Sequence, residues 1–196
     1  MIVYDVEIEK AILGKDELPL EGIEYCGGWK DFGGMGISCI GAYDYLTDQY
    51  RVFCRDNFNE FEELADCRQA VIGFNSLGFD NPLLAANGIE ICSDRAYDVL
   101  VEVWIAAGLG PTFEYPSYLG FGLEQLCQAN LGIGKTGHGA LAPVQWQAGK
   151  IGSVIDYCLR DVWLTKKLVD LIDRDGCLKD PRDPSKILAI RRPSVP

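Results

Sequence analysis

Two acidic residues lie two positions apart near the start of the chain, where residues 2–8 read Ile-Val-Tyr-Asp-Val-Glu-Ile. The β-branched and aromatic residues predict a strand. Side chains alternate between the two faces of a strand, so we expect Asp5 and Glu7 on the same face. Burying a carboxylate is costly unless a cation or hydrogen bonds compensate, and a divalent metal would compensate both acids. The alternative is the solvated face of an edge strand, because so short a motif also occurs by chance.

Two further carboxylates lie where a metal site would need them. Asp80 follows the apolar run 70–74 at a strand-to-helix junction, where α/β proteins bind ligands. Asp161 comes four residues after Tyr157 in a long helical pattern, so these side chains project from one face, one turn apart. Each acid has an alternative, purely structural interpretation. Asp80 could be only a helix N-cap, and Asp161 could be only a solvated helix residue. Taken together, the acids favour a shared site.

The bulk properties predict one soluble domain. The chain has 196 residues, of which 48% are hydrophobic and 11% aromatic, a globular composition. No apolar run approaches the ~20 residues that span a bilayer, and no export signal begins the chain. Eight cysteines without a C-x-x-C pair favour a reducing compartment and argue against a zinc ribbon. We therefore expect a cytoplasmic protein with no membrane partner.

The net charge of −11 conceals an asymmetry along the chain. Residues 1–130 hold 7 Lys and Arg against 22 Asp and Glu, whereas residues 131–196 hold 11 against 7. If the basic third folds back beside the acidic strand, a phosphate would meet both cationic side chains and a metal held by carboxylates. The alternative is ordinary variation of surface charge.

The pattern of apolar residues and turns predicts an α/β domain over residues 1–176, with a mixed sheet flanked by helices. An antiparallel hairpin forms one edge of this sheet, and parallel pairing occurs elsewhere. Asp98 is expected to cap a helix and not to bind a ligand. The expected elements are strands at 2–8, 36–45, 49–54, 70–74 and 89–97, helices at 59–65, 79–87, 99–107, 123–130 and 151–173, loops at 10–35, 108–120 and 132–149, and an extended tail at 177–196.

Three motifs in this order resemble those of the DEDD 3′-to-5′ exonucleases, a family with the ribonuclease H-like fold. Residues 4–7, Tyr-Asp-Val-Glu, look like the first motif with its D-x-E strand. Residues 75–84, Asn-Ser-Leu-Gly-Phe-Asp-Asn-Pro-Leu-Leu, are similar to the second motif, particularly the N-x-x-x-F-D-x-P-x-L form of family B DNA polymerase proofreading domains. Residues 157–161, Tyr-Cys-Leu-Arg-Asp, resemble the third, Y-x-x-x-D. Position 156 is Asp where the histidine subtype carries His, which implies the tyrosine subtype.

The resemblance spans residues 1 to about 175 and implies a two-metal mechanism. Asp5 would bridge two divalent ions, Mg²⁺ or Mn²⁺, while Glu7 and Asp161 complete one ion's site and Asp80 supports the other. Tyr157 would orient the attacking water, because a phenol with a pKa of about 10 is a poor base at neutral pH. The chain lacks a polymerase domain and its loop 10–35 is longer than the proofreading pattern requires, so we expect a stand-alone nuclease.

The expected substrate is single-stranded nucleic acid with a 3′ end, and DNA is favoured over RNA. Ile8 and Phe79 would pack or stack against terminal bases. Asn75 either bonds the substrate or holds its turn, and Lys135 and His138 would approach a phosphate, although a lone histidine is often structural. Two other classes remain as alternatives: a non-catalytic nucleic-acid-binding module with the same fold, and an unrelated acidic metal-binding protein.

Overall fold

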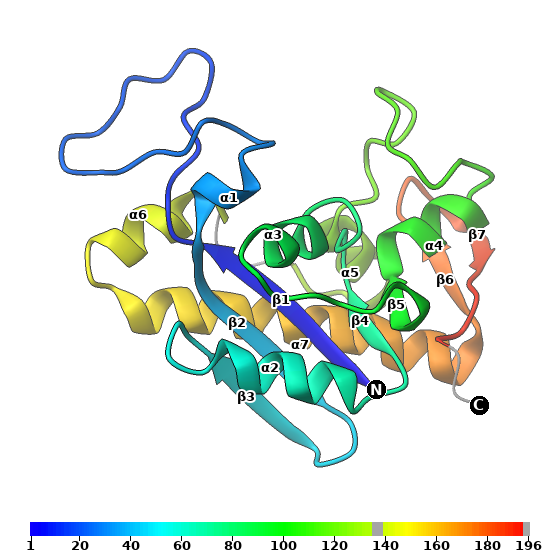
Figure 1. Cartoon of the computed structure of the whole chain (residues 1–196). Helices are drawn as coiled ribbons and strands as arrows, with labels where there is room; N and C mark the ends of the chain where they lie inside the picture. The colour runs from blue at the N-terminus through cyan, green and yellow to red at the C-terminus, as the bar shows by residue number, and fades with distance from the viewer. Residues whose placement is uncertain (135–138, 194–196) are drawn as a thin grey trace.

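The computed structural model describes residues 1–134 and 139–193, and a five-stranded mixed sheet lies at its centre (Figure 1). The strand order is β3-β2-β1-β4-β5, so β1 is the central strand. It pairs antiparallel with β2 and parallel with β4, and β3 completes the antiparallel edge. This is the predicted mixed sheet with a hairpin at one edge. The strands are β1 (Ile2–Ile8), β2 (Ile37–Asp44), β3 (Gln49–Phe53), β4 (Val71–Gly73) and β5 (Ala96–Asp98).

Helices cover both faces of the sheet and enclose two apolar cores. On one face, Ile2, Tyr4 and Val6 of β1 pack with α1, α2 and α3. On the other, Val3 and Ile72 pack with α4, α5 and α7. These helices, with the short α6 and two 3₁₀ turns, are α1 (Phe32–Met35), α2 (Phe58–Asp66), α3 (Asp80–Ala86), η1 (Ser93–Arg95), α4 (Val99–Ala106), α5 (Leu123–Leu131), η2 (Gly139–Leu141), α6 (Ala142–Gln147) and α7 (Ile151–Asp175).

Helix α7 is the longest element and crosses the sheet beneath β1 and β2 (Figure 1). Its buried side chains recur every three or four residues, as in Val154, Cys158, Asp161 and Val162, which is the spacing of one helix face. The helix ends at Gly176, whose φ of 70° is the left-handed conformation that glycine adopts at a C-cap. Within the described residues, no helix is both long and apolar enough to cross a bilayer.

Several predicted segments have a different structure from the one expected. The loop predicted over 10–35 ends in the short helix α1, which Asp31 caps by accepting a hydrogen bond from the Gly34 N–H. The strand predicted over 89–97 is wrong for most of its length, because only its last residues belong to β5 and residues 93–95 form η1. Ile89 is buried without a strand partner, so its apolar character reflects core packing and not strand pairing. The loop predicted over 132–149 contains η2 and α6. Pro143 lies in the first turn of α6, where a missing N–H costs nothing.

The tail predicted over 177–196 is a hairpin for most of its length. Strands β6 (Cys177–Asp180) and β7 (Asp183–Ala189) pair antiparallel. Leu178, Leu188 and Ile190 are buried in the core that α5 and α7 share. Two of the prolines that predicted irregular chain, Pro181 and Pro184, lie at the turn and at the start of β7, where a strand tolerates them.

Candidate active site

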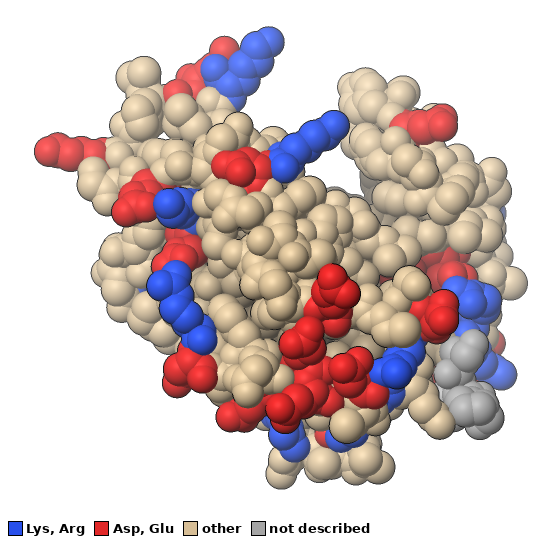
Figure 2. Space-filling model, in the orientation of Figure 1, with Lys and Arg blue, Asp and Glu red and all other residues tan. Residues whose placement is uncertain are grey.

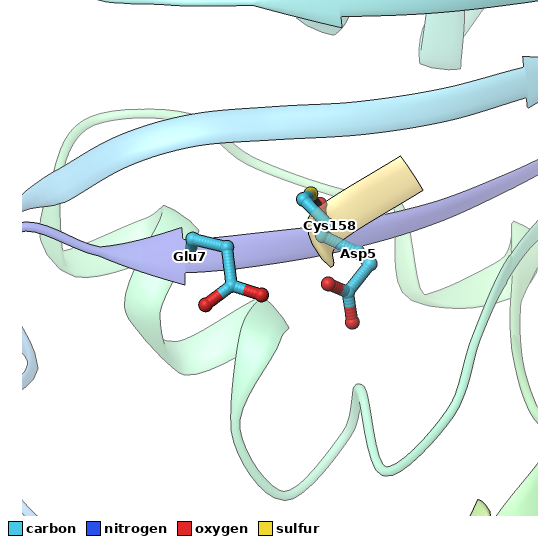
Figure 3. A group of neighbouring side chains, drawn as sticks. All are labelled: Asp5, Glu7 and Cys158. Carbon is cyan, nitrogen blue, oxygen red and sulfur yellow. Dashed lines mark hydrogen bonds between the residues drawn. The ribbon is translucent and has the colours of Figure 1, made fainter. Parts of the chain in front are cut away.

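Asp5 and Glu7 leave β1 on the face that α7 covers. Figure 3 shows both carboxylates pointing the same way from the strand, with Cys158 of α7 behind them. One ligand atom from each of these three residues lies within 4.8 Å of the others. Glu7 is only 7% exposed, whereas Asp5 is partly exposed. The strand therefore places two acids side by side, as its alternation predicts.

Gly41 allows α7 to approach the sheet at this point. It lies opposite Asp5 in the β1–β2 ladder, and a Cβ built there would lie 2.9 Å from Cys158 Sγ and 3.2 Å from a methyl carbon of Val162. The Cys158 thiol donates a hydrogen bond to the main-chain oxygen of Asp5 at 3.4 Å. Sequence reasoning missed this contact, although a glycine inside a strand pattern is a recognised signal of close backbone approach.

Cys158 is 1% exposed and packs between α7 and the sheet. A side-chain hydrogen bond with Cys39, together with burial and the nearby charges of Asp5 and Glu7, raises the pKa of the Cys158 thiol. A protonated thiol binds metal weakly, and Mg²⁺ and Mn²⁺ prefer oxygen. The oxygen donors of this cluster are therefore the carboxylates.

Asp161 and Tyr157 reach the same region from α7, one turn apart. Asp161 is 5% exposed. Burial, followed by the charges of Asp161, Glu7 and Asp5, raises the pKa of the Tyr157 phenol well above its ordinary value. The hydroxyl comes so close to Gly139 that a Cβ there would lie 3.2 Å from it. Tyr157 is thus a protonated hydroxyl surrounded by acids at neutral pH, and it can donate a hydrogen bond but not accept a proton.

Asp80 is the first residue of α3, the helix that follows β4, and β4 is the strand next to β1. The helix N-cap is Phe79, so the alternative reading of Asp80 as an N-cap is wrong. Its side chain accepts a hydrogen bond from the Val6 main-chain N–H at 3.1 Å, which ties α3 to the middle of β1. Burial raises the pKa of Asp80 to about 7, and the charges of Asp98 and Asp161 act in the same direction. Asp80 is therefore close enough to Asp161 to sense its charge.

Asp98 is a structural acid, as its position in the sequence predicts. It caps α4 by accepting hydrogen bonds from the main-chain N–H groups of Leu100 and Val101. It also accepts from those of Asn75 and Leu77 in the preceding turn, at 2.9 Å each. Asn75 itself is exposed with a φ of 60°, a conformation that asparagine tolerates. The structure thus gives Asn75 a role in holding its turn.

The acids open onto a pocket of about 260 Å³. Its lining includes the polar side chains of Glu7, Asp161 and Tyr157 and the apolar side chains of Ile8 and Phe79. Five of the predicted site residues thus line one cavity, and Asp5 lies beside Glu7 in the carboxylate cluster. Asn75 does not line it, and Lys135 and His138 lie outside the described residues. The remaining lining residues are Val6, Ile12, Trp29, Gly139, Ala140 and Pro143.

Charge is unevenly distributed over the molecular surface. Figure 2 shows acidic side chains gathered over α2, whose sequence carries Glu60, Glu62, Glu63 and Asp66. The basic last third does lie beside β1 through α7. However, five of its cations are in ion pairs with nearby acids: Lys166, Arg174, Arg182, Lys186 and Arg191. These ion pairs engage five of the eleven Lys and Arg residues of the last third.

Comparison with solved structures identifies the fold. No family model matches the sequence, and no curated protein matches it. A similar solved structure is that of the family B DNA polymerase from the hyperthermophilic archaeon Pyrobaculum calidifontis, with a TM-score of 0.58 and 14% identity. The fold prediction is confirmed. The match covers 87% of this chain and 24% of the polymerase, so the chain spans about a quarter of that protein's length. At this identity the likeness establishes architecture alone.

Proposed function

We propose that this protein is a metal-dependent 3′-to-5′ exonuclease that hydrolyses phosphodiesters of single-stranded nucleic acid, with DNA favoured over RNA. The observation that carries the proposal is the pocket whose lining combines Glu7, Asp161 and Tyr157 with apolar side chains. The acids suit a metal-bound phosphate, and the apolar side chains suit a nucleobase. The three motifs and the polymerase-like fold support the same conclusion.

The donor set fits divalent metal ions. Asp5 and Glu7 offer carboxylate oxygens from adjacent positions on one strand face, and Asp161 faces the same pocket from α7. Asp80, buried next to them, would support a second ion. Hard oxygen ligands suit Mg²⁺ or Mn²⁺, and a bound pair would activate water and stabilise charge on the phosphate.

The chain's own groups would position the substrate. Tyr157 would donate its hydroxyl hydrogen to the attacking water or to a phosphate oxygen, since a phenol with an ordinary pKa of about 10 is protonated at neutral pH. Ile8 and Phe79 would hold the terminal base by packing, which tolerates any base. Gly139 and Ala140 of η2 and Pro143 of α6 also line the pocket.

A non-catalytic binding module is less consistent with this site. Glu7, Asp80 and Asp161 are each less than 10% exposed, and burying carboxylates costs free energy that a binder of polyanions would not recover. Eight free thiols are in keeping with the proposed reducing, cytoplasmic setting.

Digestion of labelled oligonucleotides tests the proposal. Single-stranded DNA and RNA carrying a 5′ label would be incubated with the protein and Mg²⁺, Mn²⁺ or EDTA. We expect a ladder that shortens from the 3′ end, faster for DNA, and no cleavage in EDTA. Cleavage that persists in EDTA, or intact substrate under all conditions, would refute the proposed activity.

A further inference from the structure

The long loop after β1 is attached to the body of the protein next to the pocket. Gln147 of α6 donates from its side-chain nitrogen to the main-chain oxygens of Glu9 and Glu24, at 3.0 Å each. Its side-chain oxygen accepts from the Glu24 N–H at 2.7 Å. Ala11 also pairs with this part of the loop, because its N–H donates to Glu24 and its oxygen accepts from Cys26. The loop is therefore fixed at its base.

A second set of contacts fixes the segment that precedes α1. Asp31 accepts hydrogen bonds from the N–H groups of Gly27 at 2.7 Å and Gly34 at 3.1 Å. Gly28 adopts a φ of 121°, which residues other than glycine rarely reach, so the chain turns sharply there. Asn87, the C-cap of α3, donates to the main-chain oxygen of Phe32 at 3.2 Å. Trp29 lies between these anchors, so its main chain is held at a defined position.

Trp29 presents an exposed indole at the mouth of the pocket. It is 71% exposed and lines the same cavity as Glu7 and Asp161. Its ring centroid lies 6.4 Å from that of Phe79 in an edge arrangement, and Phe79 lies 5.9 Å from Phe32 in the same way. An edge contact leaves a face of the indole open. Leaving so large an apolar ring in water is unfavourable, so the arrangement favours a flat ligand that covers it.

We propose that Trp29 stacks on the unpaired nucleobase of the 3′-terminal nucleotide and that loop 10–35 is thereby part of the substrate site. This inference rests on the proposed function and adds a substrate-binding residue that none of the three motifs contains. Base stacking on an aromatic ring tolerates every base and is lost when the base is absent. The indole has no carboxylate or hydroxyl group to offer the reacting phosphate, so it acts on binding and not on the chemical step.

The test compares oligonucleotides with and without a terminal base. Wild type, Trp29→Ala and Trp29→Phe would be titrated, in EDTA to prevent cleavage, against fluorescent single-stranded DNA whose 3′-terminal nucleotide is either normal or abasic. We expect Trp29→Ala to weaken binding of the normal end about 5-fold to 100-fold and to leave binding of the abasic end unchanged. Trp29→Phe should retain most of the affinity, since it keeps an aromatic face.

Leu18→Ala is the matched control, because Leu18 lies in the same loop, is 88% exposed and does not line the pocket. It should bind both oligonucleotides like wild type. An equal loss for normal and abasic ends in Trp29→Ala, or no loss for either, would overturn the stacking role. The binding comparison does not require turnover, so a wild type that binds but never cleaves with Mg²⁺ or Mn²⁺ would refute the exonuclease proposal alone. Absence of binding by wild type would overturn the stacking role, and the digestion assay with Mg²⁺ or Mn²⁺ would still test the exonuclease proposal by itself.

Discussion

Asp44 and Asp80 are both buried carboxylates, but their partners differ. Asp44, at the end of β2, receives two hydrogen bonds from the Arg68 guanidinium, at 2.9 Å and 2.7 Å, and these hold its pKa well below the ordinary range. Asp80 receives a main-chain bond from Val6, and among the described residues no cation pairs with it. Burial raises its pKa to about 7. The protein thus supplies an arginine as counter-charge to Asp44, the acid whose role is to stabilise the fold.

This difference distinguishes a structural acid from one in a candidate metal site. Binding a cation adds little stability to a buried acid that already pairs with an arginine. It adds most stability to acids that repel one another around a pocket, because a bound ion relieves both desolvation and repulsion. Changes at the pocket should therefore affect turnover and metal response, and changes at the Asp44–Arg68 pair should affect stability.

The largest expected effect comes from removing one charge at the pocket. Asp161→Asn keeps the side-chain volume and deletes a ligand charge, so we expect it to abolish detectable cleavage of single-stranded DNA without unfolding the protein. Asp173→Asn, an exposed acid on the same helix, should cleave like wild type. If purified Asp161→Asn were as active as wild type, the third motif would be misassigned.

Tyr157→Phe should slow cleavage without abolishing it. The hydroxyl positions a reacting group and does not abstract a proton, and such a group is worth about 10²-fold to 10⁴-fold in turnover. The ring remains, so Mn²⁺ binding and oligonucleotide binding should be retained. Tyr45→Phe is the control, since Tyr45 also donates to an acid of α7, Asp170, at 2.8 Å but lies outside the pocket lining. Unchanged single-turnover rates for Tyr157→Phe would show that Tyr157 has only a packing role.

Arg68→Ala should leave the site intact and destabilise the fold. The Asp44 side chain is fully buried, so removing its cation should cost about 3 to 5 kcal/mol in urea denaturation at pH 7. Arg55→Ala breaks an ion pair with Glu9 in which the arginine side chain is 81% exposed, and should cost less than about 1 kcal/mol. Equal losses in the two variants would contradict the assignment of Asp44 as a structural acid.

The same pair predicts a pH dependence. The pKa of Asp44 is lower in the folded state than in the unfolded state, so its stabilisation is present above the unfolded value of about 4 and is lost as pH falls through the folded value. Wild type should therefore lose more stability below about pH 4 than Arg68→Ala does. Parallel acid unfolding curves for the two proteins would be inconsistent with this linkage.

Adding Mn²⁺ to metal-free protein should raise its melting temperature. An ion that binds only the folded state at 100 times its Kd adds about 2.7 kcal/mol to the free energy of unfolding. For a chain of this length that corresponds to a shift of roughly 5 to 10 °C. Asp161→Asn should show a smaller shift and Arg68→Ala an undiminished one. A wild-type melting temperature that does not respond to millimolar Mn²⁺ would count against the metal site.

The smallest effect concerns the close approach of α7 to the sheet. Gly41→Ala places a methyl group against Cys158 and Val162, and overpacking of this kind costs about 1 to 3 kcal/mol. Gly152→Ala, in the first turn of α7 with open space around it, should instead stabilise the protein by up to about 1 kcal/mol. Chemical denaturation measures both. A neutral Gly41→Ala would mean that the helix tolerates a wider separation from β1.

Local patterns in the sequence determined most of the elements and the pairing of acids on β1. The alternation of apolar and acidic residues set the faces of β1, and the helical spacing that ends at Gly176 set α7. Asp98 acts as the predicted cap. These features depend on neighbours within a few residues, so the sequence alone is sufficient to predict them.

Only the tertiary structure decided which residues far apart in the sequence come into contact. It brings Gly41 against Cys158, Trp29 beside Phe79, and Gln147 onto the loop after β1. It also turns the expected tail into the β6–β7 hairpin by burying Leu178 and Leu188 against other elements. These contacts depend on which faces pack together, and packing is a property of the whole folded chain that no local periodicity encodes.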